Sequence, residues 1–148
     1  MRVVFLSLFL TLVTPLALAD NAVRFASVDI YLDSSAPVAA WQFELTDDNG
    51  AMKVVGVENG DSEVFSDAPY YDREAVQLGT ADRIIVADFS LAGTKQLPSG
   101  NFRLTTLHLV LEGPAEPSFK LQLVTATAHD GRAIDATIRL ESPTGSEQ

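Results

Sequence analysis

The segment from Pro37 to Gly60 constrains the fold of this chain more than any other. Within it, Trp41, Phe43 and Leu45 alternate with three polar residues. An apolar residue at every second position predicts a β-strand with one buried face, because successive side chains of a strand point to opposite sides. The single tryptophan lies in the middle of this pattern. We therefore expect Trp41 to anchor a core between two packed sheets.

A turn follows the alternating run. Residues 47–50 read Asp-Asp-Asn-Gly, and Asn-Gly readily adopts the positive φ angles of a tight β-hairpin. The segment from Met52 to Val57 is expected to return as the second strand of that hairpin. The long segment after it, from Gly60 to Asp82, is expected to be irregular, except that Asp72 is placed to cap a short helical turn through Val76.

Further segments have strand-like patterns and are separated by turn residues. Arg83–Ser90 is almost continuously apolar and β-branched, which is typical of a central strand. Asn101–Glu112 carries large apolar residues at both odd and even positions, so both of its faces are expected to be covered. The other strand candidates are Val23–Leu32, Phe119–Ala128 and Ile134–Leu140. Seven to nine short strands without a helical pattern predict an all-β fold, an antiparallel β-sandwich of jelly-roll type, with a barrel as the alternative.

The N-terminus has the pattern of a secretory signal peptide. A positive Arg2 precedes the apolar run Val3–Leu12, and Ala17-Leu18-Ala19 supplies small residues for cleavage after Ala19. A membrane anchor is disfavoured because Thr14-Pro15 interrupts the apolar run. We expect residues 1–19 to be a signal peptide, 20–141 a single β-sandwich domain and 142–148 a disordered tail. The mature chain is then periplasmic or extracellular, with no stable membrane insertion.

Composition excludes several classes of function. The chain has 20 acidic and 10 basic residues and a formal net charge of −10; loss of Arg2 with the signal peptide makes it −11. Such a charge opposes binding to nucleic acid. Cysteine is absent, which excludes disulfides, thiol catalysis and cysteine metal sites.

The sequence contains no recognisable catalytic motif. Its two histidines, His108 and His129, stand in no zinc-binding spacing, and no Gly-x-Ser-x-Gly elbow occurs. We expect His108 to be a hydrogen-bonded structural residue of a strand and His129 to be a solvated turn residue. The chain is therefore expected not to be an enzyme and to need no cofactor.

Two groups of carboxylates offer oxygen ligands of the kind that calcium prefers. They are Asp47 with Asp48, and Asp61 with Glu63. Neither group has EF-hand spacing, so charged turns exposed to water are the simpler interpretation.

The best candidates for a binding site are aromatic residues of the long irregular segment. Phe65, Tyr70 and Tyr71 lie close together in the sequence, and Pro69 stiffens the backbone between them. Aromatic rings on a loop can anchor a protein interface or stack on sugar rings. The alternative is that these rings fold down and close one end of the sandwich.

The order of the predicted strands resembles that of cohesin modules and of the related β-sandwiches that include some carbohydrate-binding modules. The residues that carry the resemblance are Val28 and Ile30, Ala39–Leu45, Val54–Gly60, Ile84–Phe89, Pro98-Ser99-Gly100, Leu104 and Leu107. The resemblance implies a nine-stranded jelly-roll-like sandwich with a recognition role, since cohesins bind dockerin modules.

The function expected from this resemblance is non-catalytic recognition of another envelope or secreted protein. A carbohydrate-binding module, with a polysaccharide as its partner, is the first alternative. A small secreted hydrolase is the second.

Overall fold

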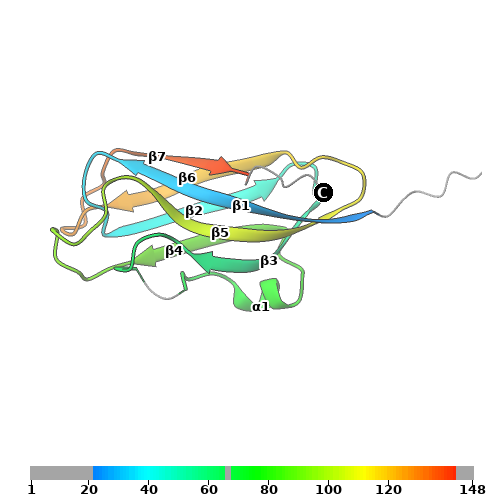
Figure 1. Cartoon of the computed structure of the whole chain (residues 1–148), viewed down its shortest axis with the longest axis horizontal. Coiled ribbons are helices and arrows are strands. Elements are labelled where there is room, and N and C mark those ends of the chain that lie inside the picture. Colours follow the sequence, from blue (N-terminus) through cyan, green and yellow to red (C-terminus); the bar gives the residue numbers. More distant parts are fainter. Residues whose placement is uncertain (1–21, 66–67, 143–148) are drawn as a thin grey trace, which may run out of the picture.

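The computed structural model describes residues 22–65 and 68–142. The predicted signal peptide and residues 143–148 of the predicted tail lie outside the described residues. The elements, shown in Figure 1, are β1 (Val23–Ser34), β2 (Ala40–Asp47), β3 (Met52–Asn59), α1 (Arg73–Gln77), β4 (Arg83–Phe89), β5 (Gly100–Glu112), β6 (Phe119–Thr127) and β7 (Ala136–Glu141).

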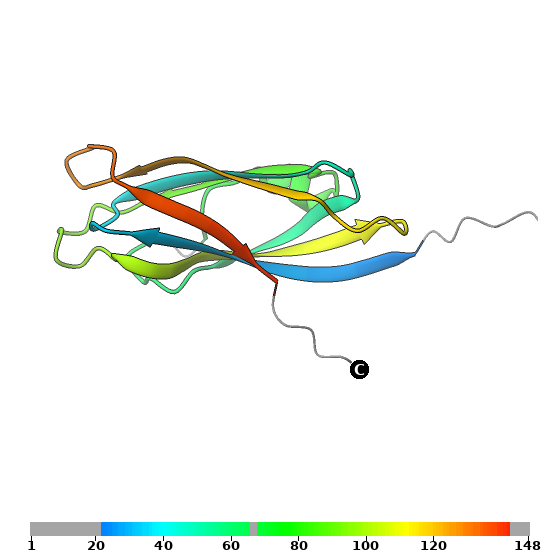
Figure 2. The same cartoon turned by 90° about the horizontal axis from the view of Figure 1, so that it is seen from above.

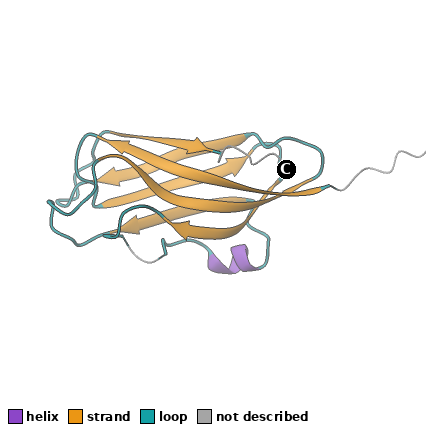
Figure 3. Cartoon of the chain, viewed as in Figure 1, coloured by secondary structure: helices purple, strands orange, loops and turns teal. Residues whose placement is uncertain are grey.

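The strands form two sheets that pack face to face, as Figure 2 shows from above. One sheet has the order β3-β5-β1-β7 and the other the order β4-β2-β6. Every strand pairing is antiparallel. The predicted antiparallel β-sandwich is confirmed, with seven strands among the described residues. The only helix in that part of the chain is the short α1, which lies at one side of the sandwich (Figure 3).

The predicted hairpin at residues 47–50 is wrong. Gly50 has the expected positive φ of 65°, but β2 and β3 belong to different sheets. The turn therefore carries the chain from one layer to the other. The physical reason is that alternation specifies which face of a strand is buried but not its neighbour. The side chains of Met52 and Val54 are buried where β3 pairs with β5. The same two side chains would also have been buried if β3 had paired with β2 in a hairpin, so the pattern fits both arrangements.

The prediction that Arg83–Ser90 is a central strand is also wrong. β4 lies at the edge of its sheet. Ile84 and Val86 are buried, whereas Ile85 and Phe89 are exposed. The nearly continuous apolar run thus combines core residues with apolar residues on the outer surface of the sheet.

Trp41 anchors the core, as predicted, with only 2% of its surface exposed. Its ring stacks on Phe43 and meets the ring of Phe65 edge to face, with both centroid distances at 5.9 Å. Ile30 from β1 and Leu107 from β5 are fully buried in the same cluster. Burying one side chain of this size contributes about 1.5–3 kcal/mol, so the core explains how the sandwich is stable without disulfides.

A β-bulge explains why β5 has large apolar residues at both odd and even positions. Ile30 of β1 pairs with Thr105 and its neighbour pairs with Arg103, so Leu104 is an extra residue in the ladder. An extra residue reverses which positions face inward. Leu104 before the bulge and Leu107 after it both enter the core, and Val110 remains on the outer face.

The short helical turn predicted after Asp72 is present as α1. The Asp72 side chain accepts a hydrogen bond from the Ala75 amide at 2.9 Å and caps the helix. Gly79 then takes a positive φ of 65° and ends it.

Candidate protein-docking face

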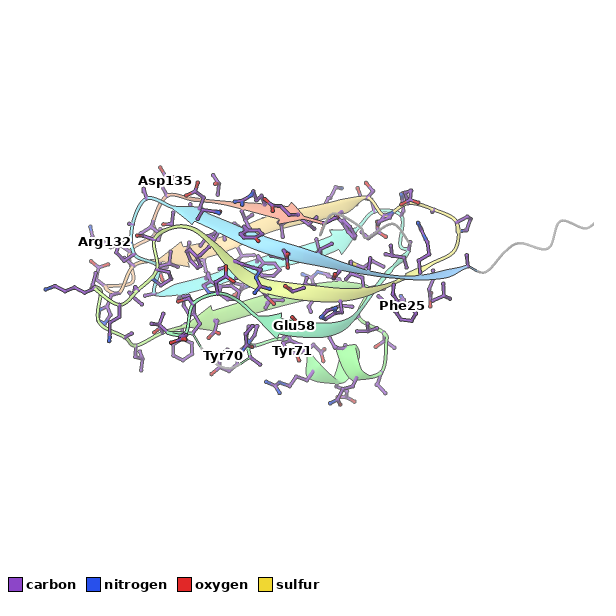
Figure 4. All side chains as sticks on the ribbon, in the orientation of Figure 1. Phe25, Glu58, Tyr70, Tyr71, Arg132 and Asp135 are labelled. Carbon is purple, nitrogen blue, oxygen red and sulfur yellow. The ribbon has the colours of Figure 1, made fainter. Side chains whose placement is uncertain are left out.

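The structure places the three predicted binding aromatics in different environments. Phe65 and Tyr71 are partly buried against the core, and the guanidinium of Arg73 lies 5.4 Å from the centre of the Tyr71 ring. Tyr70 is 58% exposed. Figure 4 shows Tyr70 and Tyr71 on the same side of the sandwich. Only Tyr70 of the three therefore presents most of its ring to solvent.

Tyr70 extends the sheet that contains Trp41. Its backbone N–H donates to the Ala87 carbonyl at 2.8 Å and its carbonyl accepts from the Ala87 N–H at 3.0 Å. This bridge sets Tyr70 beside β4 at the edge of the sheet. Its ring stacks on Phe89, with a centroid distance of 6.0 Å and an angle of 9° between the planes.

The outer surface of the β4-β2-β6 sheet is formed by residues that alternate with those of the core. We call one part of this surface the docking face. It consists of Ala40 and Gln42 from β2, Ile85, Ala87 and Phe89 from β4, Thr125 and Thr127 from β6, and Tyr70. The register places Phe89, Ala40 and Thr127 in one row and Ala87, Gln42 and Thr125 in the next.

The docking face carries no charged side chain. Tyr70, Phe89 and Ile85 are exposed large apolar residues, at 58%, 49% and 38%. Val124, at the bulge of β6 on the other side of β2, is 48% exposed. Singly scattered apolar residues need no explanation, but several on one flat surface are typical of a protein-interaction site. Exposed aromatic rings are the commonest anchors of such sites.

Charged residues adjoin the docking face, and Glu44 of β2 lies directly opposite Ile85 in the register. Arg83 of β4 donates a hydrogen bond to Glu44 of β2 across the sheet. This hydrogen bond holds the pKa of Glu44 below its ordinary value and that of Arg83 above it. Lys120 of β6 pairs with Asp48 at 2.8 Å. Within each pair the two opposite charges bind each other. The pairs therefore form a polar rim in which these charges are already engaged.

The outer surface of the other sheet has a different chemistry. Arg103 binds Asp61 through two hydrogen bonds of 3.0 and 3.1 Å and lies 3.7 Å from Asp29. Burial disfavours the charged guanidinium, but these carboxylates outweigh burial and hold the pKa of Arg103 above its ordinary value. Arg139 lies over the ring of Tyr31 at 4.6 Å. Paired charges therefore occupy much of this surface, in contrast to the docking face.

The calcium candidates have other partners in the structure. Asp47 accepts hydrogen bonds from four backbone amides, those of Asn49, Ala51, Met52 and Ser118. Burial works against the charged carboxylate, but the four hydrogen bonds together keep the pKa of Asp47 below its ordinary value of 3.8.

The other acidic candidates do not assemble a site either. Asp48 binds Lys120 and Asp61 binds Arg103, while Glu63 is exposed. Among residues 22–65 and 68–142, no three His, Asp or Glu side chains are grouped so that they could hold a metal ion. The carboxylates of Asp47, Asp48 and Asp61 thus serve turns and ion pairs, which argues against the calcium hypothesis.

The two histidines lie in separate parts of the molecule. His108 of β5 has its Nε2 2.7 Å from a carboxylate oxygen of Glu58, as expected for a hydrogen-bonded strand residue. His129 follows β6 and lines an open cavity of about 420 Å³ together with Asp130 and Arg132. The Asp130 carboxylate binds Arg132 at 2.6 Å, and this hydrogen bond holds the pKa of Asp130 below its ordinary value. The carboxylate beside His129 is therefore engaged by a cation, and this arrangement gives the hydrolase hypothesis no support.

The carbohydrate-binding hypothesis requires a row or cleft of exposed aromatic rings. Phe65 and Tyr71 pack against the core, and the exposed Tyr70 stacks on Phe89 instead of lying beside it. A carbohydrate-binding module is accordingly not favoured.

Sequence reasoning missed most of the docking face. It identified Tyr70 but not Phe89 or Ile85. The sequence did contain a signal for these residues. If Arg83–Phe89 is treated as a strand with one buried face, its apolar residues at alternate positions, Ile85 and Phe89, are expected to face outward. They were read instead as the second buried face of a central strand.

No helix in the described ranges is long and apolar enough to cross a lipid bilayer.

Comparison with known proteins gives structural matches only. No family model matches the chain, and no curated protein matches it. Two similar structures are complexes. The first is that of CaDoc0917 with CaCohA2, with a TM-score of 0.57, 15% identity and coverage of 76% of this chain and 82% of that chain. The second is a type I cohesin–dockerin complex, Coh-OlpA–Doc918 from Clostridium thermocellum, with a TM-score of 0.53, 16% identity and the same two coverages.

A third similar structure is a non-cellulosomal cohesin from the hyperthermophilic archaeon Archaeoglobus fulgidus. Its TM-score is 0.51 and its identity 14%, with coverage of 75% of this chain and 72% of that chain. At these identities the matches establish the fold.

Proposed function

Because the described chain has a cohesin-like fold, we propose that it is a non-catalytic recognition domain that binds another protein through the docking face. The observation that carries this proposal is the uncharged part of the outer surface of the β4-β2-β6 sheet that forms the docking face, with Tyr70, Ile85 and Phe89 exposed on it. On a chain with a formal net charge of −10, such a surface is unusual and suits contact with a complementary apolar surface.

The similar structures support a protein as the partner. One of them is a cohesin–dockerin complex, in which two protein modules bind each other. A stable interface between proteins covers roughly 800 Å² on each partner. A flat sheet surface extended by the Tyr70 bridge is well shaped for such contact, whereas the open cavity beside His129 would admit only a small molecule.

The location of the partner follows from the predicted export of the chain. If residues 1–19 direct export, the partner is an envelope or secreted protein. The exposed apolar residues of the docking face lie along β4, and the Arg83–Glu44 pair borders them at one end. Aromatic residues beside a polar rim are typical of the residues that dominate binding energy.

This proposal is tested by capture of partners from the exported fraction of the cells that produce the protein. The double variant Tyr70→Ala/Phe89→Ala removes both stacked rings, and we expect its affinity for the captured protein to fall at least tenfold, equivalent to about 1.4 kcal/mol. Affinity is measured by calorimetry once mass spectrometry has identified the captured protein.

The matched control is Leu78→Ala, which removes an exposed apolar side chain just after α1, outside the docking face. Its affinity should equal that of the native protein. Equal losses in the control and the double variant, or no loss in either, would contradict docking through this face.

A further inference from the structure

The first half of β1 has an open edge. β1 pairs with β5 from Val23 to Ser34, but β7 covers its other side only from Asp29 to Ser34. Among the described residues, no strand pairs with the second side of residues 23–28. Two apolar residues of this segment are highly exposed, Val23 at 57% and Phe25 at 81%. Figure 4 shows Phe25 near the beginning of β1.

The hydrogen-bond pattern shows which backbone groups are left open. The Gly113 N–H donates to the Ala22 carbonyl at 2.9 Å, so the even-numbered residues of this part of β1 direct their N–H and C=O groups toward β5. Because these groups alternate in direction along a strand, Val23, Phe25 and Ser27 direct theirs to the open side. The same three side chains lie on the outer face of the sheet, since Val28 and Ile30 point into the core.

The other sheet edges of the described chain are covered or interrupted. Ala81 bridges to Val54 at the edge of β3, and Tyr70 bridges to β4. The edge strand β6 has a bulge and is bridged by Ala133 near its end. β7 is only six residues long and exposes Arg139 and Glu141. Bulges, charges and short lengths are among the devices that prevent unwanted strand pairing. Residues 23–28 are also few, but they contain no bulge and no bridge covers them, and their one charged side chain, Arg24, is engaged by Glu116.

We propose that the open edge of residues 23–28 pairs with the same edge of a second copy of this chain. An antiparallel pairing with Phe25 opposite the second copy's Phe25 also places Val23 opposite the second copy's Ser27. Each of these pairs then exchanges two backbone hydrogen bonds. Both phenylalanine rings lie on the same outer surface, where opposite aromatic residues in a sheet attract each other. The two four-stranded sheets become one continuous sheet.

Charge favours a second copy at this edge. Each copy has a formal net charge of −10, so two copies repel each other over most of their surfaces. The open edge itself presents Val23, Phe25 and Ser27, which are uncharged. The only charged residue within it, Arg24, binds Glu116 at 2.6 Å and the Ala115 carbonyl at 2.8 Å. Two copies can therefore meet at this edge without like charges facing each other directly, and added salt should strengthen their association by screening the charges on the rest of the surface.

Sedimentation equilibrium of the purified chain tests this proposal. The average mass should rise toward twice the monomer mass as the protein concentration increases, and it should rise further at high salt. Phe25→Lys adds a charge at the centre of the pairing and should weaken association at least tenfold. Ser27→Pro removes an N–H that points to the open side without removing a bond to β5, so it should weaken association while the fold is kept, as circular dichroism can verify.

A matched control is Tyr70→Lys, which places the same charge on the docking face and should leave self-association unchanged. It also separates this inference from the proposed function, because it should impair partner binding alone. A native chain that stays monomeric at every concentration and salt level would overturn the proposal. So would self-association that appears only after removal of residues 143–148, because the chain's own end would then be the occupant of the edge.

Discussion

At the scale of single residues, the structure gives Asp47 a role in holding the turn between β2 and β3 in place of the calcium-binding role that was considered for it. Asp47 and Gly50 were predicted to form a turn, and they do, but the reason for the aspartate at this position was not visible in the sequence. Its carboxylate accepts hydrogen bonds from backbone amides of the β2–β3 turn and from the amide of Ser118, the residue before β6. A contact across 71 residues leaves no local pattern, so sequence reasoning offered calcium as the alternative.

Replacement of Asp47 by alanine should destabilise the protein by about 2 kcal/mol, because four backbone amides lose a charged acceptor. Asp47→Asn should cost less, since its single amide oxygen can still serve the pair of amides now bound by one carboxylate oxygen. Urea unfolding monitored by the fluorescence of the single tryptophan measures both. Equal stability of native protein and Asp47→Ala would contradict the role assigned to this carboxylate.

The same residue gives a pH dependence with a definite sign. The pKa of Asp47 is lower in the folded chain than its ordinary value of 3.8. Its charged form therefore contributes stability that is fully present above about that value and disappears as the pH falls through the lower folded pKa. The stability difference between the native protein and Asp47→Asn should shrink over this acidic range. A difference that stays constant down to the folded pKa would argue against ionisation as its cause.

At the scale of elements, the strands could be predicted and their neighbours could not. Alternation located β1, β2 and β6 because each buries one face of a strand. The same alternation does not specify which strands pair. For this reason β2 and β3 were wrongly predicted to form a hairpin, and β4 was wrongly predicted to be a central strand. The bulge at Leu104 shows a second limit, because one extra residue makes a strand with a single buried face look buried on both.

Gly60 tests how closely β3 and β5 approach at the end of their pairing. A Cβ atom at this position would lie 2.2 Å from the Arg103 carbonyl oxygen and 2.5 Å from that of Leu104. Since both are backbone atoms of a central strand, moving them aside costs considerable free energy. Gly60→Ala should destabilise the fold by about 3 kcal/mol, measured by urea unfolding. Gly93→Ala, whose Cβ would approach only the Gln96 side chain at 4.0 Å, is the control and should be nearly neutral.

At the scale of the whole molecule, two outer surfaces of one sandwich have separate properties. The docking face lies on the β4-β2-β6 sheet and is uncharged, while the other sheet carries paired charges and the open edge of β1. The general fold could be inferred from strand number, turn residues and the cohesin-like order of segments. The docking face could not, because it depends on which apolar residues of β4 turn outward and on the bridge that brings Tyr70 beside them.

The most direct test of recognition through the docking face is a cross-linking measurement. A photo-activatable amino acid is introduced at Gln42, in the middle of this face, or at His108, on the outer surface of the other sheet. The account predicts a covalent product with a different protein of the exported fraction from position 42 and none from position 108. A product with a different protein from position 108 alone, or in equal yield from both positions, would contradict it.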